Sequence, residues 1–146
     1  MPSKPPYHKQ EKRYSCVTAC LRMVLAAFGL KVPESELQDA CDATFRGASA
    51  LQAVDAARQF GFTRSAKHTL TLDELRTVVE DGLFPIVFVS LWPLDRIQEV
   101  HALVVIEFAE PDIVVLDPLQ GERRLPLQNF TSAWQARRNL AILIEP

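Results

Sequence analysis

The spacing of apolar residues changes half-way along the chain. In the first half, Val17, Leu21, Val24 and Phe28 recur at helical spacing, and Gly29 follows as a helix end. From residue 85 onward, apolar residues stand in continuous β-branched runs such as "PIVFVSLW", which is typical of buried strands. Helices therefore precede strands, and this order predicts an α+β fold rather than alternating βαβ units.

Glycines, prolines and capping residues set the expected boundaries. After the first helix, helices are predicted at 34–41, 48–60, 71–82 (starting near Thr71 or Asp73) and 127–135. Strands are predicted at 62–68, 85–92, 99–108, 112–118, 122–125 and 139–146. Residues 1–9, which are polar and proline-rich, are expected to form a flexible arm, and residues 10–146 a single domain.

Composition excludes several classes of partner. The formal charge is −2, so nothing favours nucleic acid or an anionic membrane surface, and short basic pairs such as Arg123–Arg124 are expected to be solvated surface. The N-terminus has no signal-peptide pattern, and the longest apolar run, around 100–108, contains His101 and is too short to span a membrane. A cytoplasmic location follows as the expectation, and the sequence carries no indication of oligomeric state.

Three cysteines, an odd number, argue against a disulfide framework. Cys16 stands at the expected start of the first helix, after Ser15 as a candidate N-cap, and a helix N-terminus stabilises a thiolate. Cys20, one turn further, and Cys41 are expected to pack in the core. Cys16 is therefore the candidate nucleophile, although the same position also suits a small apolar residue.

A thiolate nucleophile needs a histidine base and a polar group that orients it. His101 opens the predicted strand "HALVVI", and Asp117 ends the next strand at "VVLDP". If these strands are joined by the turn at "EPD", His101 and Asp117 lie at matching ends and the carboxylate can reach the imidazole. The alternatives are a structural histidine and an aspartate that only makes the turn before Pro118.

Gln10 lies a short loop before Cys16. Acyl transfer develops an oxyanion, which a backbone N–H and a side-chain amide usually stabilise, and Gln10 can supply that amide. Cys16, Cys20 and His101 could instead ligate zinc, but the sequence has no CxxC pair and no clear fourth ligand. No cofactor is expected, because the five glycines form no phosphate-binding fingerprint.

In this order, the segments "QEKRYSCVTACLRMVLAAFG", "VHALVVIEF" and "IVVLDPLQGERRLPLQNF" resemble the papain-like cysteine peptidases of family 39, which process bacteriocin precursors after a double glycine. The resemblance implies a papain-like fold, with an N-terminal helical part packed on an antiparallel sheet. It also implies that Cys16 is the nucleophile, His101 the base and acid, Asp117 the orienting residue and Gln10 the oxyanion donor. The implied partner is a peptide or protein substrate with an extended segment.

Two departures from the family pattern bear on specificity. Ser15 and Val17 stand where the family has Asp and Gly around the cysteine, and Val17 is expected to add bulk beside the nucleophile. The transporter segments of some family members do not follow, so a stand-alone cysteine peptidase is expected. Two other functions stay open on the same residues: a module that binds a leader peptide or tail without cutting it, and an acyl or peptidyl transferase.

Overall fold

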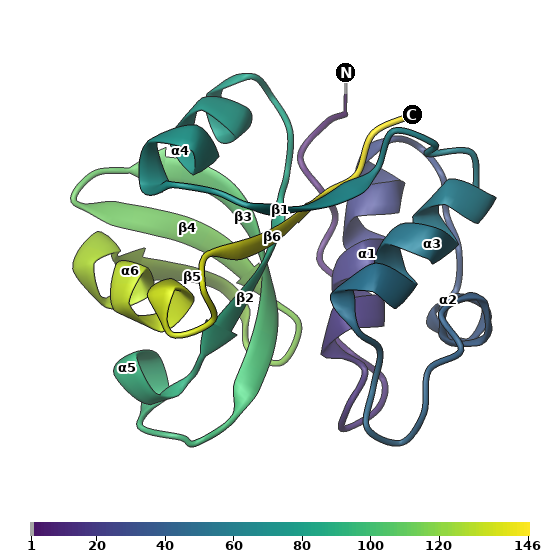
Figure 1. Cartoon of the computed structure of the whole chain (residues 1–146), viewed down its shortest axis with the longest axis horizontal. Helices are drawn as coiled ribbons and strands as arrows, with labels where there is room; N and C mark the ends of the chain where they lie inside the picture. Colours follow the sequence, from purple (N-terminus) through teal and green to yellow (C-terminus); the bar gives the residue numbers. More distant parts are fainter. Residues whose placement is uncertain (1) are drawn as a thin grey trace.

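The computed structural model describes residues 2–146 and shows two parts, a helical part and a sheet with its own helices (Figure 1). The helices are α1 (Cys16–Ala27), α2 (Glu34–Ala40), α3 (Ala50–Gln59), α4 (Leu72–Glu80), α5 (Trp92–Asp95) and α6 (Leu127–Gln135). The strands are β1 (Ala66–Thr69), β2 (Ile86–Ser90), β3 (Val100–Ala109), β4 (Asp112–Asp117), β5 (Gly121–Pro126) and β6 (Leu140–Leu143). Helices α1 to α3 form the helical part.

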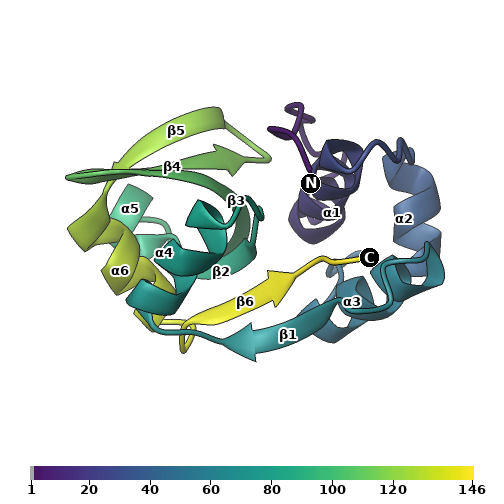
Figure 2. The ribbon, with the colours of Figure 1, turned by 90° about the horizontal axis from the view of Figure 1, so that it is seen from above.

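The six strands form one sheet in the order β1-β6-β2-β3-β4-β5, and every neighbouring pair is antiparallel. Strands β2 to β5 follow one another along the chain, whereas β6 returns from the C-terminus to lie between β1 and β2. Seen from above, β1 and β6 extend from the sheet towards α3 (Figure 2). The predicted α+β fold, a helical part packed on an antiparallel sheet, is confirmed.

Both faces of the central strands are buried, which explains the continuous apolar runs in the sequence. Along β3, Ala102 and Val104 belong to the core that also contains Leu21 of α1. Leu103 alternates with them and belongs to a second core with Trp134 of α6. Figure 2 shows the same arrangement, with the sheet curving around α4, α5 and α6 and with α1 on its other side.

Helix α1 begins at Cys16 as predicted, but Ser15 does not cap it with its side chain. The Ser15 hydroxyl instead accepts a hydrogen bond from the Lys12 N–H at 3.0 Å and donates one to the Lys12 carbonyl at 3.0 Å. Ser15 therefore occupies the expected N-cap position, but the tight turn before the helix takes up its hydroxyl, which does not cap an N–H of α1. Thr71, in contrast, caps α4 and forms a capping box with Glu74.

The predicted strand at 85–92 extends too far. Strand β2 ends at Ser90, and the short helix α5 begins at Trp92, with Pro93 in its first turn. Proline cannot donate to a strand ladder, but its fixed φ suits the start of a helix. The predicted strand at 62–68 also begins later, at Ala66.

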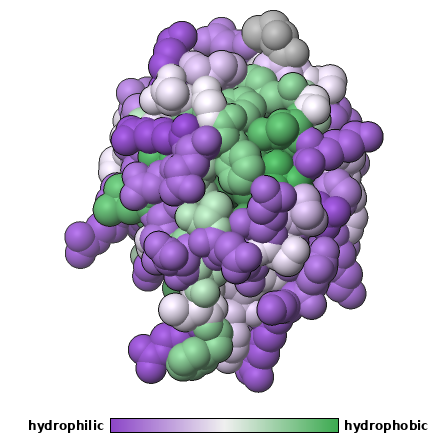
Figure 3. Space-filling model, turned by 90° about the vertical axis from the view of Figure 1, so that its right-hand side faces the viewer, coloured by the Kyte–Doolittle hydropathy of each residue, from purple (hydrophilic) through white to green (hydrophobic). Residues whose placement is uncertain are grey.

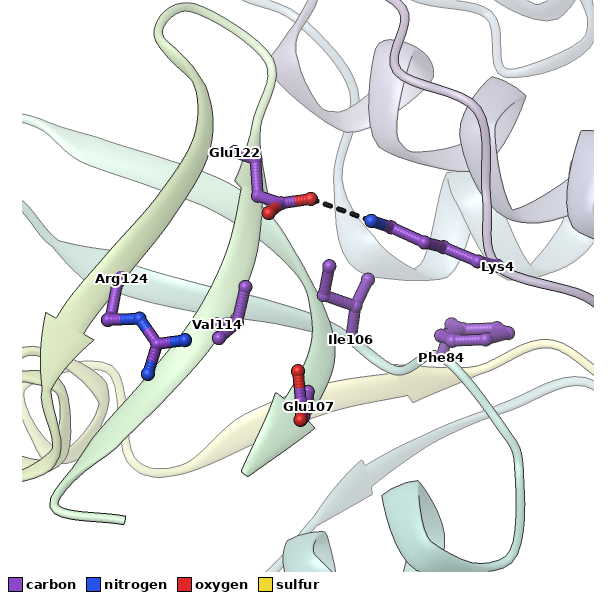
Figure 4. Close-up of a pocket in the computed structure, with 7 residues that line it drawn as sticks. All are labelled: Lys4, Phe84, Ile106, Glu107, Val114, Glu122 and Arg124. Atoms are coloured by element: carbon purple, nitrogen blue, oxygen red, sulfur yellow. Dashed lines mark ion pairs between the residues drawn. The ribbon is translucent and has the colours of Figure 1, made fainter. Parts of the chain in front are cut away.

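The arm before residue 10 runs between the helical part and the sheet. The Ser3 N–H donates to the carbonyl of Ala27 at the end of α1 at 3.0 Å, and the Lys4 ammonium pairs with Glu122 of β5 at 2.9 Å. Figure 4 shows Lys4 reaching towards Glu122. Both residues line a pocket of about 410 Å³, together with Glu107 and Arg124. The arm thus makes defined contacts with both parts of the molecule.

The side of the molecule formed by α2 and α3 carries an apolar area in the upper part of the view (Figure 3). Several hydrophobic residues of the helical part are only partly buried where they pack against its core, among them Phe28, Leu30 and Phe60. Apolar surface of this extent is ordinary for a folded domain.

Cys20 should contribute more to the free energy of unfolding than Cys16. The Cys20 side chain is 0% exposed in the core, so Cys20→Ala should lower the free energy of unfolding by about 1–2 kcal/mol. Cys16 is only half-buried, so Cys16→Ala should cost clearly less. Urea unfolding under reducing conditions measures both. Equal losses would contradict this placement of the two cysteines.

Candidate active site

Cys16 lies at the junction of the two parts. It is the first residue of α1, directly after the turn at residues 12–15, and its thiol is half-buried. Its backbone N–H donates no hydrogen bond within residues 2–146, as is usual for the first amide of a helix. The α1 start therefore presents a thiol and a free amide together.

His101 and Asp117 are joined by a hydrogen bond in the sheet. His101 Nε2 lies 2.8 Å from Asp117 Oδ1, and the side chains are 5% and 1% exposed. His101 is the second residue of β3, Asp117 is the last residue of β4, and the register pairs Val104 with Leu116. The two are thus not direct cross-strand partners, and the carboxylate reaches along β3 to the imidazole. The expected proximity is confirmed, with a small offset in register.

The Cys16 thiol is the other polar neighbour of the imidazole. Cys16 lines the same pocket as His101 and is among the neighbours that raise the pKa of the imidazole. Because Asp117 engages Nε2, Nδ1 is the ring nitrogen left for the thiol. The structure therefore brings together three of the four residues expected at the site, in the order thiol, imidazole, carboxylate.

The electrostatics of the imidazole follow from burial and from its two neighbours. Burial alone lowers the pKa of His101, but the interactions with Asp117 and Cys16 outweigh it and raise the pKa from 6.5 to about 9. Burial likewise raises the pKa of Asp117, yet hydrogen bonds from His101, the Leu119 N–H and Arg123 hold it below its usual value. His101 is thus a cation and Asp117 an anion at neutral pH.

Arg123 is a member of this network that the sequence interpretation placed on the solvated surface. Its guanidinium donates to Asp117 Oδ2 at 3.1 Å and to both oxygens of Asp95 at 2.7 and 3.1 Å, and its side chain is only 17% exposed. The sequence does contain a pattern that could have indicated the burial of Arg123. Alternation along β5 puts Arg123 on the same face as the buried Leu125, where an arginine needs an acidic partner.

Gln10 is buried, and its backbone N–H donates to the carbonyl of Pro118, next to Asp117, but its side-chain amide is bonded within the turn before α1. Its amide nitrogen donates to the carbonyls of Lys12 and Arg13 at 2.8 and 3.0 Å, and its Oε1 has no hydrogen-bond partner within the described residues. Exchanging the amide oxygen and nitrogen would set Oε1 against two carbonyls, so the orientation is fixed. Both amide hydrogens hold the 12–15 turn, and donation to an oxyanion requires one of them to be released.

A pocket of about 250 Å³ opens over the thiol and the imidazole. Its lining comes from both parts of the molecule: Arg13, Tyr14, Cys16 and Arg46 on one side, and Glu99, Val100, His101 and Leu119 on the other. Val17, expected to crowd the nucleophile, is 5% exposed and packs in the core of α1, outside the pocket lining. That expectation is wrong, because residue 17 points into the protein.

Within residues 2–146, no group of three or more His, Cys, Asp or Glu side chains is arranged to hold a metal ion. The zinc alternative lacks a donor set here, since Cys20 lies in the core.

No helix in the same residues is long and apolar enough to cross a membrane. The site is a Cys–His–Asp arrangement.

Comparison with known proteins agrees with this geometry. The model of the peptidase C39 family matches residues 4–146, and the chain belongs to this family of cysteine peptidases. No curated protein sequence matches significantly.

Solved structures share the fold. The double glycine motif protease of an AMS/PCAT transporter, in complex with the leader peptide, has a TM-score of 0.76 and 23% identity, over 99% of this chain and 94% of that chain. The peptidase domain of Streptococcus ComA has a TM-score of 0.75 and 23% identity, over 97% and 99%. A Bacillus anthracis protein described as C39-like has a TM-score of 0.83 and 16% identity, over 97% and 94%. At these identities the likeness concerns the papain-like fold.

The raised pKa of His101 makes stability depend on pH. In the folded protein the pKa is about 9, above its usual 6.5, so the charged imidazole stabilises the fold fully below pH 6.5. This contribution, on the order of 3 kcal/mol, should be lost as pH rises from 6.5 through 9. Chemical unfolding of the wild type and His101→Gln between pH 6 and 10 should show a difference in unfolding free energy that shrinks with pH. A pH-independent difference would contradict the assigned titration.

Proposed function

We propose that this peptidase hydrolyses peptide bonds with Cys16 as nucleophile, His101 as acid and base, and Asp117 as the group that orients His101. The observation that carries the proposal is the 2.8 Å hydrogen bond that His101 Nε2 donates to Asp117, because it leaves the other ring nitrogen for the Cys16 thiol in the same pocket. Membership of the C39 family supports the reaction class.

The chemistry follows from this order of groups. The sulfur attacks the substrate carbonyl carbon as a thiolate while His101 holds its proton. The new C–S bond gives a tetrahedral oxyanion, which the free N–H of Cys16 faces at the start of α1. The C–N bond then breaks, and the imidazolium donates its proton to the leaving amine. His101 next takes a proton from water, whose oxygen attacks the thioester and releases the carboxylic product and the thiol.

Asp117 and Arg123 support this cycle from behind the imidazole. The carboxylate fixes the ring with a proton on Nε2 and stabilises the imidazolium, which is the resting form at neutral pH and donates its proton to the leaving amine. Arg123, itself held by Asp95, keeps the second oxygen of Asp117 occupied and charged. Gln10 joins the oxyanion site only if one of its two carbonyl bonds opens, so its proposed role as oxyanion donor includes a small movement of the 12–15 turn.

The proposed substrate is a peptide or protein with an extended segment that threads the pocket between the two parts of the molecule. A neighbouring fold is a double glycine motif protease in complex with a leader peptide, which supports a Gly-Gly-type site as the first to test. We treat residues 10–146 as one peptidase domain and residues 1–9 as an arm. A stand-alone role and a cytoplasmic location stay predictions from the sequence.

Cys16 should be the reactive thiol. Iodoacetamide at neutral pH should alkylate Cys16 much faster than Cys20 and Cys41, because burial raises the pKa of both other thiols, that of Cys41 to about 11. Peptide mapping by mass spectrometry gives the three rates. Equal rates in the folded protein would refute the catalytic assignment.

Asp117→Asn should reduce turnover of a fluorogenic peptide ending in Gly-Gly by at least an order of magnitude, with little change in KM. The amide keeps the shape but loses the charge that stabilises the imidazolium. Asp112→Asn, at the opposite end of β4, is the matched control and should keep wild-type turnover.

A wild-type rate in Asp117→Asn, with His101→Ala inactive, would return Asp117 to a turn residue and leave a Cys–His dyad. Product analysis with and without an added amine distinguishes a hydrolase from a transferase on the same residues. Binding of the peptide without any cleavage by the wild type would favour the binding module.

A further inference from the structure

Two arginines stand on the wall of the pocket that contains Cys16. Arg13 lies in the turn before α1, and Arg46 lies in the loop between α2 and α3. Both side chains are exposed, and both line the 250 Å³ pocket together with Cys16 and His101. They come from two separate segments of the helical part, which also supplies Cys16 to the lining.

Neither arginine is used in an ion pair within residues 2–146. Each guanidinium instead lies over the ring of its own neighbour, Arg13 at 5.3 Å from the Tyr14 ring centre and Arg46 at 5.4 Å from that of Phe45. Arg22, Arg76 and Arg123, in contrast, pair with carboxylates. Other arginines such as Arg64 and Arg96 are also unpaired within the described residues, but Arg13 and Arg46 are the two that line this pocket. Arg13 and Arg46 therefore keep their full hydrogen-bonding capacity for a ligand.

The two segments that carry the arginines are in backbone contact. At Gly47, which has φ +91°, an added Cβ would lie 2.5 Å from the carbonyl oxygen of Tyr14, so the two backbones touch. The Arg46 N–H donates to Thr44 Oγ1 at 3.1 Å, and the Arg13 carbonyl accepts from Gln10 at 3.0 Å. The backbones that carry the two guanidinium groups thus lie side by side, next to the start of α1.

We infer that Arg13 and Arg46 form a subsite for a carboxylate of the substrate beside the scissile bond. The inference rests on the catalytic role proposed for Cys16. The planar guanidinium group of arginine can donate two parallel hydrogen bonds to a carboxylate. Two guanidinium groups without an ion-pair partner in one pocket lining therefore favour the binding of an anion. The acidic residue in the pocket lining, Glu99, belongs to the opposite wall and forms no ion pair with either arginine. A substrate carboxylate should therefore lie on the helical side of the cleft.

The carboxylate can come from an Asp or Glu side chain or from a chain terminus. For the side chain, peptidyl chloromethyl ketones acetyl-Xaa-Ala-Gly and acetyl-Ala-Xaa-Gly are compared with Xaa as Glu or Gln. These reagents alkylate Cys16 irreversibly, so intact mass and peptide mapping give a second-order rate constant even when binding is weak. For a terminal carboxylate, iodoacetate is compared with its neutral counterpart iodoacetamide.

We expect the carboxylate reagent to react about fivefold to tenfold faster than its neutral counterpart at low salt in at least one of the two comparisons. The advantage should shrink at high salt and fall several-fold in the double variant Arg13→Gln/Arg46→Gln. Arg64→Gln, which removes the same charge from the segment between α3 and β1, should keep it. If the double variant loses the rate advantage only in the comparison of Glu with Gln, the subsite binds a side-chain carboxylate. If it loses the advantage only in the comparison of iodoacetate with iodoacetamide, the subsite binds a terminal carboxylate.

Unchanged ratios in the double variant for both comparisons would overturn the subsite, since the advantage would then come from His101 or from the overall field. In that case Cys16 is still alkylated faster than Cys20 and Cys41, and the catalytic proposal stands. If Cys16 shows no selective alkylation by any reagent, the catalytic proposal itself fails, and the subsite fails with it.

Discussion

The buried pair of Asp117 and His101 is the interaction on which the rest of the site depends. A carboxylate that is 1% exposed loses nearly all of its hydration, and such a group is tolerated only with several donors. Asp117 has three: the His101 imidazole, the Leu119 N–H and the Arg123 guanidinium. The charges then alternate from Asp95 through Arg123, Asp117 and His101, and Cys16 stands at the open end of this chain.

The two parts of the fold position different members of the site. The sheet holds His101 and Asp117 on adjacent strands, where the antiparallel ladder fixes their separation. The helical part supplies Cys16 at a helix start, where backbone amides are free. Since the pocket draws its lining from both parts, its width depends on how α1 packs against β3, and apolar burial on that face keeps the thiol beside the imidazole.

Much of this was accessible from the sequence, because its signals are local. Apolar spacing and Gly29 located α1, and two apolar runs around a short turn placed His101 and Asp117 on neighbouring strands. The features that sequence reasoning missed depend on contacts between distant segments. The Ser15 hydroxyl bonds to Lys12 and does not cap an N–H of α1. The Val17 side chain points into the core. Arg123, one of the basic pair at 123–124, is paired with Asp95, which is 28 residues away in the sequence.

The central claim is that His101 carries a stabilised positive charge between a carboxylate and a thiol. The most direct test is an NMR titration of the His101 ring in the intact protein, with His101→Gln used to assign the signal. The account predicts a pKa of about 9, well above the ordinary value of 6.5, with a proton on Nε2 at neutral pH. A pKa at or below 6.5, with Nε2 unprotonated at neutral pH, would contradict it.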